Sequence, residues 1–199
     1  MLLGLAQWVF CFYLLNKWHI KRSFFEWLYI FPWISTTAYL FQYDGIFSSL
    51  LFAYFGTILY VCATIDWHYL ILPDEGAWLL FLGAVGLHLE SGSEEILSYV
   101  ISSVCLASFL YFLRWISRGG VGLGDVKYAF VLGLWVSPTL SAIMMGLAFV
   151  LGAIYAVIVK ASYKGESLLP FGPFLCLSGG LCYLWGEFMK EGIYTLNYW

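Results

Sequence analysis

Long apolar segments follow one another along almost the whole chain, and they limit the folds open to it more than any other feature. Hydrophobic residues make up 62% of the 199 residues and charged residues only 11%, whereas a soluble domain carries roughly 25% charged residues. A chain with so little charge cannot cover its apolar surface by folding in water. We therefore expect the lipid bilayer to be its solvent. The net charge of −3 comes without a basic tract, which argues against a nucleic-acid partner.

Eight of these segments are candidate membrane spans, since about 20 apolar residues cross a hydrocarbon layer of roughly 30 Å. Two of them, those after Asp74 and after Asp125, are short, and a short helix is tolerated in a bilayer where protein or water surrounds its end. We predict an all-α, polytopic transmembrane bundle of about eight spans that forms a single domain over residues 1–199. The segments are Leu2–Leu15, Phe24–Phe41, Ile46–Ile65, Ala77–Leu89, Ile96–Ile116, Val126–Val136, Thr139–Val159 and Leu168–Phe188.

The basic residues predict which ends of the spans face the cytoplasm. With eight spans, the odd-numbered connections share one side, and they contain every lysine and arginine except Lys190. Because basic residues gather on the cytoplasmic side, the N-terminus is expected outside and Asp66 and Asp125 at the cytoplasmic face. The residues concerned are Lys17, Lys21, Arg22, Arg114, Arg118, Lys127, Lys160 and Lys164.

Two aspartates lie where apolar segments end or begin. Asp66 opens the stretch DWHYLILPDE, and Asp125 lies in the glycine-rich stretch GLGDVK. Ionisable residues at membrane depth are costly and usually carry function. Two carboxylates brought together can share one proton, so that one activates water while the other polarises a carbonyl. This pattern predicts an aspartic-protease mechanism that needs no metal and no cofactor.

Structural roles are also open to these residues. Asp66 alone could cap a helix or pair with a lysine, and Asp125 alone could be the N-cap of the short helix that follows. Asp74, directly after Pro73, fits the first turn of a helix, with a role facing the substrate as its second interpretation. Lys127 is expected to anchor the topology rather than to tune Asp125. The sequence contains no CxxC pair and no cluster of histidines, so it does not suggest a metal site.

Three motifs, in this order, resemble the type IV prepilin peptidases, a family of membrane aspartic proteases. They are DWHYLILPD at Asp66–Asp74, GLGDVK at Gly122–Lys127 and LPFGPFLCLSG at Leu169–Gly179. The resemblance covers roughly residues 46–188, which is most of the chain.

This resemblance implies specific roles. Asp66 and Asp125 would be the catalytic pair, Gly122 and Gly124 would shape the loop below Asp125, and the segment around Gly172 would form a bend beside the site, where a helix-start turn is an equal interpretation. That bend contains Pro170, Gly172 and Pro173, and the supporting loop also includes Pro73, Asp74 and Lys127.

The resemblance also implies a substrate and a location. Such enzymes remove a short basic leader from prepilins and pseudopilins at the cytoplasmic face of a prokaryotic inner membrane, in pilus assembly or protein secretion. Asp74, Glu75 and Glu166 are candidates for meeting the leader's positive charges. Larger members carry a cytosolic insert with CxxC motifs that is linked to N-methylation, whereas the first connection here is only NKWHIKRS. The chain therefore resembles a short, peptidase-centred form, and neither methyl transfer nor zinc is expected.

Two other functions fit part of the pattern. A presenilin-like intramembrane protease also uses a GxGD motif, but its partner aspartate follows a tyrosine inside a span, whereas Asp66 follows Ile65 and closes its span. A transporter or scaffold could use the aspartates for protons or cations. Such proteins usually place carboxylates near the bilayer midplane, in broken helices of paired repeats, and the sequence has neither feature.

Overall fold

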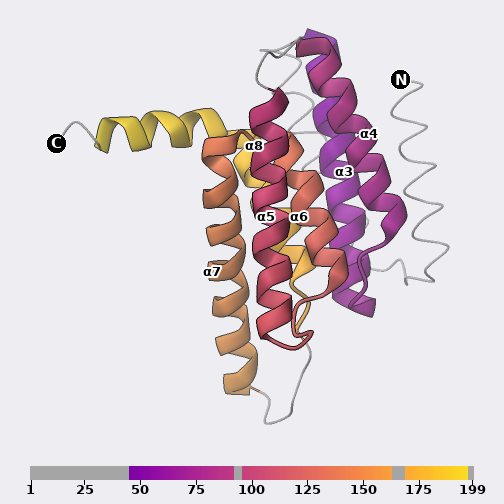
Figure 1. Cartoon of the computed structure of the whole chain (residues 1–199), viewed down its shortest axis with the longest axis vertical. Coiled ribbons are helices and arrows are strands. Elements are labelled where there is room, and N and C mark those ends of the chain that lie inside the picture. The colour runs from indigo at the N-terminus through magenta and orange to yellow at the C-terminus, as the bar shows by residue number, and fades with distance from the viewer. Residues whose placement is uncertain (1–44, 92–95, 163–168, 197–199) are drawn as a thin grey trace. The chain divides into compact units, whose positions relative to one another are not determined.

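Every element of the described chain is a helix, as Figure 1 shows for this computed structural model. The structure describes residues 45–91, 96–162 and 169–196. The predicted all-α fold is confirmed for this part, while the segments Leu2–Leu15 and Phe24–Phe41 lie outside it and the count of eight spans stays a prediction. The helices are α3 (Gly45–Tyr69), α4 (Asp74–Ser91), α5 (Ile96–Ile116), α6 (Leu123–Trp135), α7 (Pro138–Ser162) and α8 (Gly172–Leu196).

Two helices were predicted to be short, α4 and α6, and only α6 is short in the structure. It has 13 residues, whereas α4 has 18 and is about 27 Å long at 1.5 Å per residue. The sequence prediction was too short for α4 because it counted apolar residues only. The first turn of α4 consists of Asp74 and Glu75 followed by Gly76, and acidic residues are favourable at the N-terminus of a helix.

The chain divides into two compact units, Met1–Val61 and Cys62–Trp199, and the boundary falls within α3. The described part of the first unit is the beginning of α3, where the Thr57 hydroxyl donates a hydrogen bond to the Ala53 carbonyl one turn earlier. The second unit holds the last two turns of α3 and all of α4 to α8. Asp66 and Asp125 both lie within the second unit.

Helix α6 is the central helix of the second unit. It packs against α4, α5 and α8, and eight of its 13 residues are buried, from Asp125 near its start to Trp135 at its end. A helix that is apolar on all sides is stable only when other helices enclose it. The short α6 is therefore surrounded by protein, as the sequence argument required for a short span.

Side-chain hydrogen bonds hold α4 against α6 along its length. The Tyr128 hydroxyl donates to the Pro73 carbonyl at 2.9 Å, at the start of α4. Further along, the Trp135 indole donates to the Leu80 carbonyl at 2.8 Å. The His88 ring nitrogen Nε2 lies 2.9 Å from the Leu134 carbonyl oxygen near the other end. These bonds to main-chain oxygens fix α4 in position along α6.

The outer helices expose apolar side chains. On α5, Leu97 is 67% and Trp115 is 74% exposed, and on α7, Val157 is 69% exposed. Among the described residues, two helices are long and apolar enough to cross a membrane, Ile96–Ile116 and Pro138–Ile158. Exposed apolar faces on helices of this length fit lipid as the surrounding medium, as the sequence predicted.

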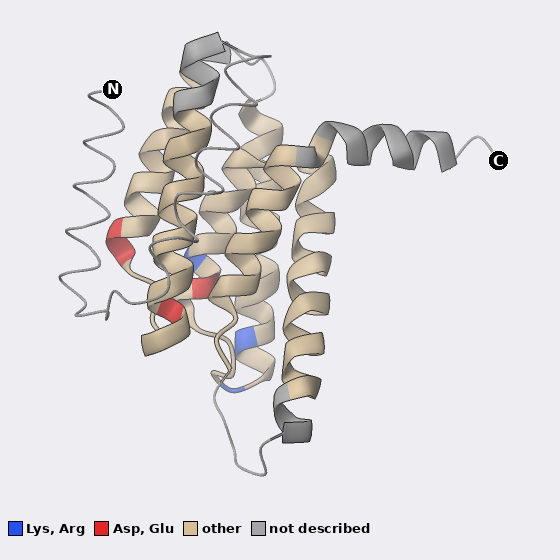
Figure 2. Ribbon diagram, turned by 180° about the vertical axis from the view of Figure 1, so that it is seen from behind, with Lys and Arg blue, Asp and Glu red and all other residues tan. Residues whose placement is uncertain are grey.

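The connections that carry the two aspartates meet at one end of the second unit. In Figure 1, the turn between α5 and α6 lies at the same lower end of the bundle as the beginnings of α4 and α8. The ribbon segments coloured for lysine and arginine in Figure 2 lie toward this end as well. This arrangement agrees with the prediction, made from the basic residues, that these connections share one side.

We predict that Gly133→Ala on α6 destabilises the bundle by about 1–3 kcal/mol, the usual effect of overpacking a core. A Cβ atom there would lie 2.7 Å from the Ser103 hydroxyl and 2.8 Å from the Ser103 Cα of α5, and a main-chain atom cannot move aside cheaply. Gly146→Ala on α7 is the matched control, because its Cβ would meet no atom within 4 Å. Thermal unfolding in detergent measures both, and equal midpoints for the two variants would contradict the close α5–α6 packing.

Candidate active site

Asp66 lies in the last turn of α3 and is only 5% exposed. Its Oδ2 atom accepts a hydrogen bond of 3.0 Å from the backbone N–H of Gly172, the first residue of α8. The first amides of a helix have no partner within the helix, and the helix dipole favours a negative charge beside them. Asp66 thus caps a helix, as the structural interpretation allowed, but the helix is a distant one in the sequence.

Asp125 is the third residue of α6 and is 8% exposed. Its Oδ2 atom accepts a hydrogen bond of 3.2 Å from the backbone N–H of Gly122, which is the N-cap residue in an extended conformation. Asp125 is therefore not the N-cap itself. It takes the position from which an acidic side chain reaches back to the N-cap amide, one half of a capping box.

The two carboxyl groups lie just outside the apolar segments Ile46–Ile65 and Val126–Val136 and act on each other. Burial raises the pKa of Asp66 to about 6, and the Gly172 amide opposes this rise. Burial and then the charge of Asp66 raise the pKa of Asp125 to about 7, against the Gly122 amide. Between these two pH values one carboxyl group is ionised while the other keeps its proton, which is the state that aspartic-protease chemistry requires.

Glycines leave room for both carboxylates. A Cβ atom on Gly172 would lie 2.6 Å from Oδ2 of Asp66, and one on Gly122 would lie 3.0 Å from Oδ2 of Asp125. A Cβ atom on Gly124 would instead lie 3.0 Å from the Cβ atom of Leu72. The glycines at Gly122 and Gly172 therefore let a backbone amide approach a carboxylate closely.

The expected bend with Pro170, Gly172 and Pro173 contains the start of α8, which begins at Gly172. The Phe171 carbonyl accepts hydrogen bonds of 3.1 Å from the amides of Phe174 and Leu175, as the residue before a helix does. Pro173 is the second residue of α8, where the lack of an amide hydrogen costs nothing. Within the predicted bend, Gly172 reaches a catalytic candidate through its N–H, and no described hydrogen bond links Pro170 or Pro173 to the aspartates.

Asp74 and Lys127 form an ion pair, which the sequence interpretation did not foresee. The Lys127 ammonium lies 2.6 Å from Oδ1 of Asp74, and the two side chains are 53% and 63% exposed. An exposed ion pair contributes at most about 1 kcal/mol. The pair links the start of α4 to the second turn of α6, close to Pro73 and Asp125 in the sequence, and neither residue touches the carboxylates of the aspartate pair in the described contacts.

Two residues that matter for the geometry were missed by the sequence interpretation. Tyr128 follows Asp125 by one helical turn, and its buried hydroxyl bonds the Pro73 carbonyl and lies 2.9 Å from the Cys62 sulfur. Leu72 is buried although it follows an exposed stretch. The sequence contained a signal for each. Leu72 is an apolar residue directly before the proline at the start of a helix, and Tyr128 is a polar aromatic residue one turn after an aspartate.

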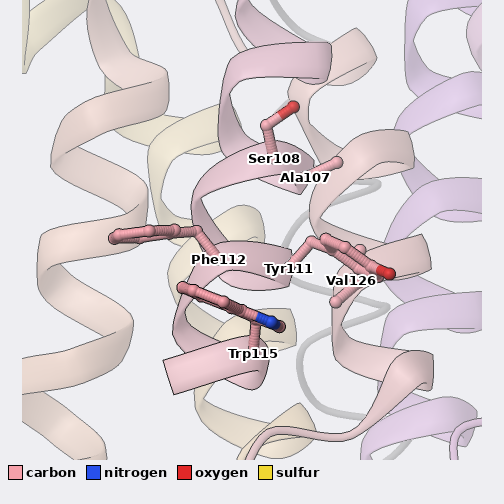
Figure 3. A pocket seen from close by; sticks show the side chains of 6 residues that line it. All are labelled: Ala107, Ser108, Tyr111, Phe112, Trp115 and Val126. Carbon is pink, nitrogen blue, oxygen red and sulfur yellow. The ribbon is translucent and has the colours of Figure 1, made fainter. Parts of the chain in front are cut away.

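A hollow of about 660 Å³ lies on the outer side of α5, next to the start of α6. Figure 3 shows its lining side chains, with Tyr111, Phe112 and Trp115 on α5 and Val126 on α6. Val126 follows Asp125, but neither aspartate lines the hollow. Its walls are mostly apolar, so it belongs to the lipid-facing surface rather than to the aspartate pair.

No group of three or more histidine, cysteine, aspartate or glutamate side chains that could hold a metal ion occurs among the described residues. His68 instead contacts the Thr64 carbonyl in its own helix at 2.9 Å. Glu166, expected near the leader, lies outside the described residues.

The sequence pattern of the Type IV leader peptidase family matches residues 53–157, which include both aspartates. A prepilin leader peptidase/N-methyltransferase of Aeromonas salmonicida is 28% identical over 137 residues, 65% of this chain and 47% of the relative. One of Dichelobacter nodosus is 32% identical over 65% of this chain and 46% of the relative. A type 4 prepilin-like proteins leader peptide-processing enzyme of Escherichia coli is 42% identical over 74 residues, 35% of this chain and 26% of the relative.

The matched region spans about half the length of the curated relatives. No solved structure matches the chain significantly.

We predict that Asp66→Asn lowers the pKa of Asp125. The substitution removes the negative charge that raises this pKa, while burial continues to raise it. Carboxyl carbon chemical shifts of labelled aspartate, followed across a pH series in detergent, would measure the change. Asp74→Asn is the control and should leave the pKa of Asp125 unmoved, because Asp74 pairs with Lys127 instead. An unchanged Asp125 titration in the Asp66→Asn variant would show that the two carboxyl groups are not coupled.

Proposed function

Because the chain belongs to the type IV leader peptidase family, a family of aspartic-type proteases, we propose that it removes leaders from prepilin or pseudopilin precursors with Asp66 and Asp125 as the catalytic pair. The observation that carries this function is the pair itself. Two buried carboxyl groups come from different helices, each accepts a backbone amide at the start of a helix, and the charge of one acts on the other. The relatives' names also include methyl transfer, and we propose only the peptidase reaction here.

The environments of the two carboxyl groups suggest separate tasks. Burial raises the pKa of both carboxyl groups and a backbone amide lowers the pKa of each, but the charge of Asp66 raises the pKa of Asp125 further, so Asp125 is the group that keeps its proton to the higher pH. Ionised Asp66 would take a proton from water as the water oxygen attacks the scissile carbonyl carbon. Asp125 would give its proton to the carbonyl oxygen, forming a neutral tetrahedral diol. Breakdown of the diol releases the amine with a proton from the pair, so no covalent intermediate forms.

The membrane setting follows from the family and from the exposed apolar helices. The family is an inner-membrane family. We propose that the aspartate end of the bundle faces the cytoplasm, because three basic residues are close to Asp125 along the chain: Arg114 in the last turn of α5, Arg118 in the connection to α6, and Lys127 in α6. A basic leader would reach this end directly. Its positive charges would compete with Lys127 for the exposed Asp74 carboxylate, next to Glu75.

We predict that Asp66→Asn and Asp125→Asn each reduce cleavage of a prepilin by at least about a hundredfold, the usual contribution of a general acid or base. Asp74→Asn should keep most of the activity, because it removes only an exposed ion pair. The assay is leader removal in detergent, followed by mass spectrometry, with membrane insertion and thermal stability checked for each variant. An inactive Asp74→Asn enzyme together with an active Asp66→Asn enzyme would show that Asp66 is not a member of the catalytic pair.

We also predict a bell-shaped pH profile for cleavage, with its maximum between about pH 6 and 7. Below about pH 6 both carboxyl groups are protonated, so the base is lost and the rate falls with decreasing pH. Above about pH 7 both are ionised, so the acid is lost and the rate falls with increasing pH. The initial rate of leader removal, measured at constant ionic strength, tests this. A rate that stayed flat from pH 5 to 9 would speak against a shared proton.

A further inference from the structure

One leucine in the connection between α3 and α4 is buried, although the residues before it are not. Leu70 is 43% and Ile71 is 53% exposed, whereas Leu72 is 6% exposed. Apolar residues at a membrane surface gain little from turning inward when lipid is available outside. Contacts within the protein therefore have to explain why Leu72 is buried.

The Leu72 side chain lies close to two glycines, Gly124 and Gly172, which are next to the aspartate pair. Its Cβ atom is 3.0 Å from the position that a Cβ atom on Gly124 would take, and its Cδ1 atom is 3.0 Å from the corresponding position on Gly172. Gly124 directly precedes Asp125 at the start of α6. Gly172 begins α8 and donates its amide hydrogen to Asp66. One side chain thus contacts both of the main-chain turns that hold a carboxylate.

Hydrogen bonds to the main chain hold the segment before Leu72 and the residue after it. On one side, the Leu70 amide donates to the Asp66 carbonyl at 2.8 Å, with Leu70 in the left-handed conformation at φ 57°. On the other side, the Pro73 carbonyl accepts the hydrogen bond of the buried Tyr128 hydroxyl. Asp66 and Tyr128, which belong to the two aspartate-bearing helices, therefore fix the ends of the segment that carries Leu72.

We infer that Leu72 is a positioning residue that sets the separation between the turn holding Asp66 and the turn holding Asp125. A branched apolar side chain in a close-packed site has a fixed volume, so two turns that both contact it cannot move closer to it. Leu72 does not touch the reacting atoms. It acts through Gly124 and Gly172, and this inference rests on the proposed peptidase function.

The test compares Leu72→Ala with Leu72→Met and with Leu80→Ala. Leu80 is also buried, and its carbonyl accepts a hydrogen bond from Trp135 at the opposite end of α6 from Asp125, so it is a matched large-to-small control. We expect Leu72→Ala to lower kcat for prepilin cleavage at least tenfold with KM within about twofold, and Leu72→Met, which restores volume, to recover most of kcat. Leu80→Ala should keep kcat at a temperature where all three variants remain folded.

A second measurement reads the separation directly and does not need activity. Cysteines replace Asp66 and Asp125 in a chain whose natural cysteines are alanines, and a short bifunctional thiol reagent joins them. Leu72→Ala should lower the crosslinked fraction at least threefold relative to the same double-cysteine protein with Leu72 unchanged and to the one with Leu72→Met. An unchanged fraction, or a kcat loss that Leu80→Ala shares equally, would overturn the positioning role. Cleavage that survives Asp66→Asn would instead refute the proposed function, so the two failures are distinguishable.

Discussion

The site depends on two backbone amides, those of Gly172 and Gly122, each of which donates a hydrogen bond to a buried carboxylate. A carboxylate removed from water without such a donor is strongly destabilised in its charged form. Amides at the start of a helix are suited to the task, because they lack a partner within the helix and carry the positive end of its dipole. Each aspartate therefore gains a hydrogen-bond donor, and each helix start gains an acceptor for an amide. Glycine at these two positions permits the close approach of amide and carboxylate.

The position of α6 explains why these groups meet. It is the central helix of its unit, it carries Asp125 in its first turn, and it contacts α4, α5 and α8. Tyr128 ties it to the segment that follows Asp66, and its close approach to α5 at Gly133 leaves no space for a larger residue. A displacement of α6 along its axis would thus move one carboxylate relative to the other. The rigid packing around a short helix is what turns two remote motifs into one site.

The sequence predicted the helical class and the six helices of the described part, because apolar runs of span length have few alternatives in lipid. It also predicted that the connections holding Asp66 and Asp125 share one end, from the positions of lysine and arginine. It did not predict the length of α4, since polar first-turn residues such as Asp74 do not register as apolar. Local signals marked Tyr128 and Leu72, but the partners of Lys127, Tyr128 and Leu72 could not be predicted from the sequence. They depend on which helices pack together, and hydropathy does not encode that.

The shortness of α6 has a consequence for the membrane around it. Its 13 residues extend about 20 Å, roughly 10 Å less than the hydrocarbon layer, so protein or water has to fill the remaining depth. Under the proposed peptidase function, a substrate helix that reached the aspartates would have to unwind beside this short helix. The unwound residues would expose amides and carbonyls that lipid cannot satisfy, so their hydrogen-bond partners would have to come from the protein or from water.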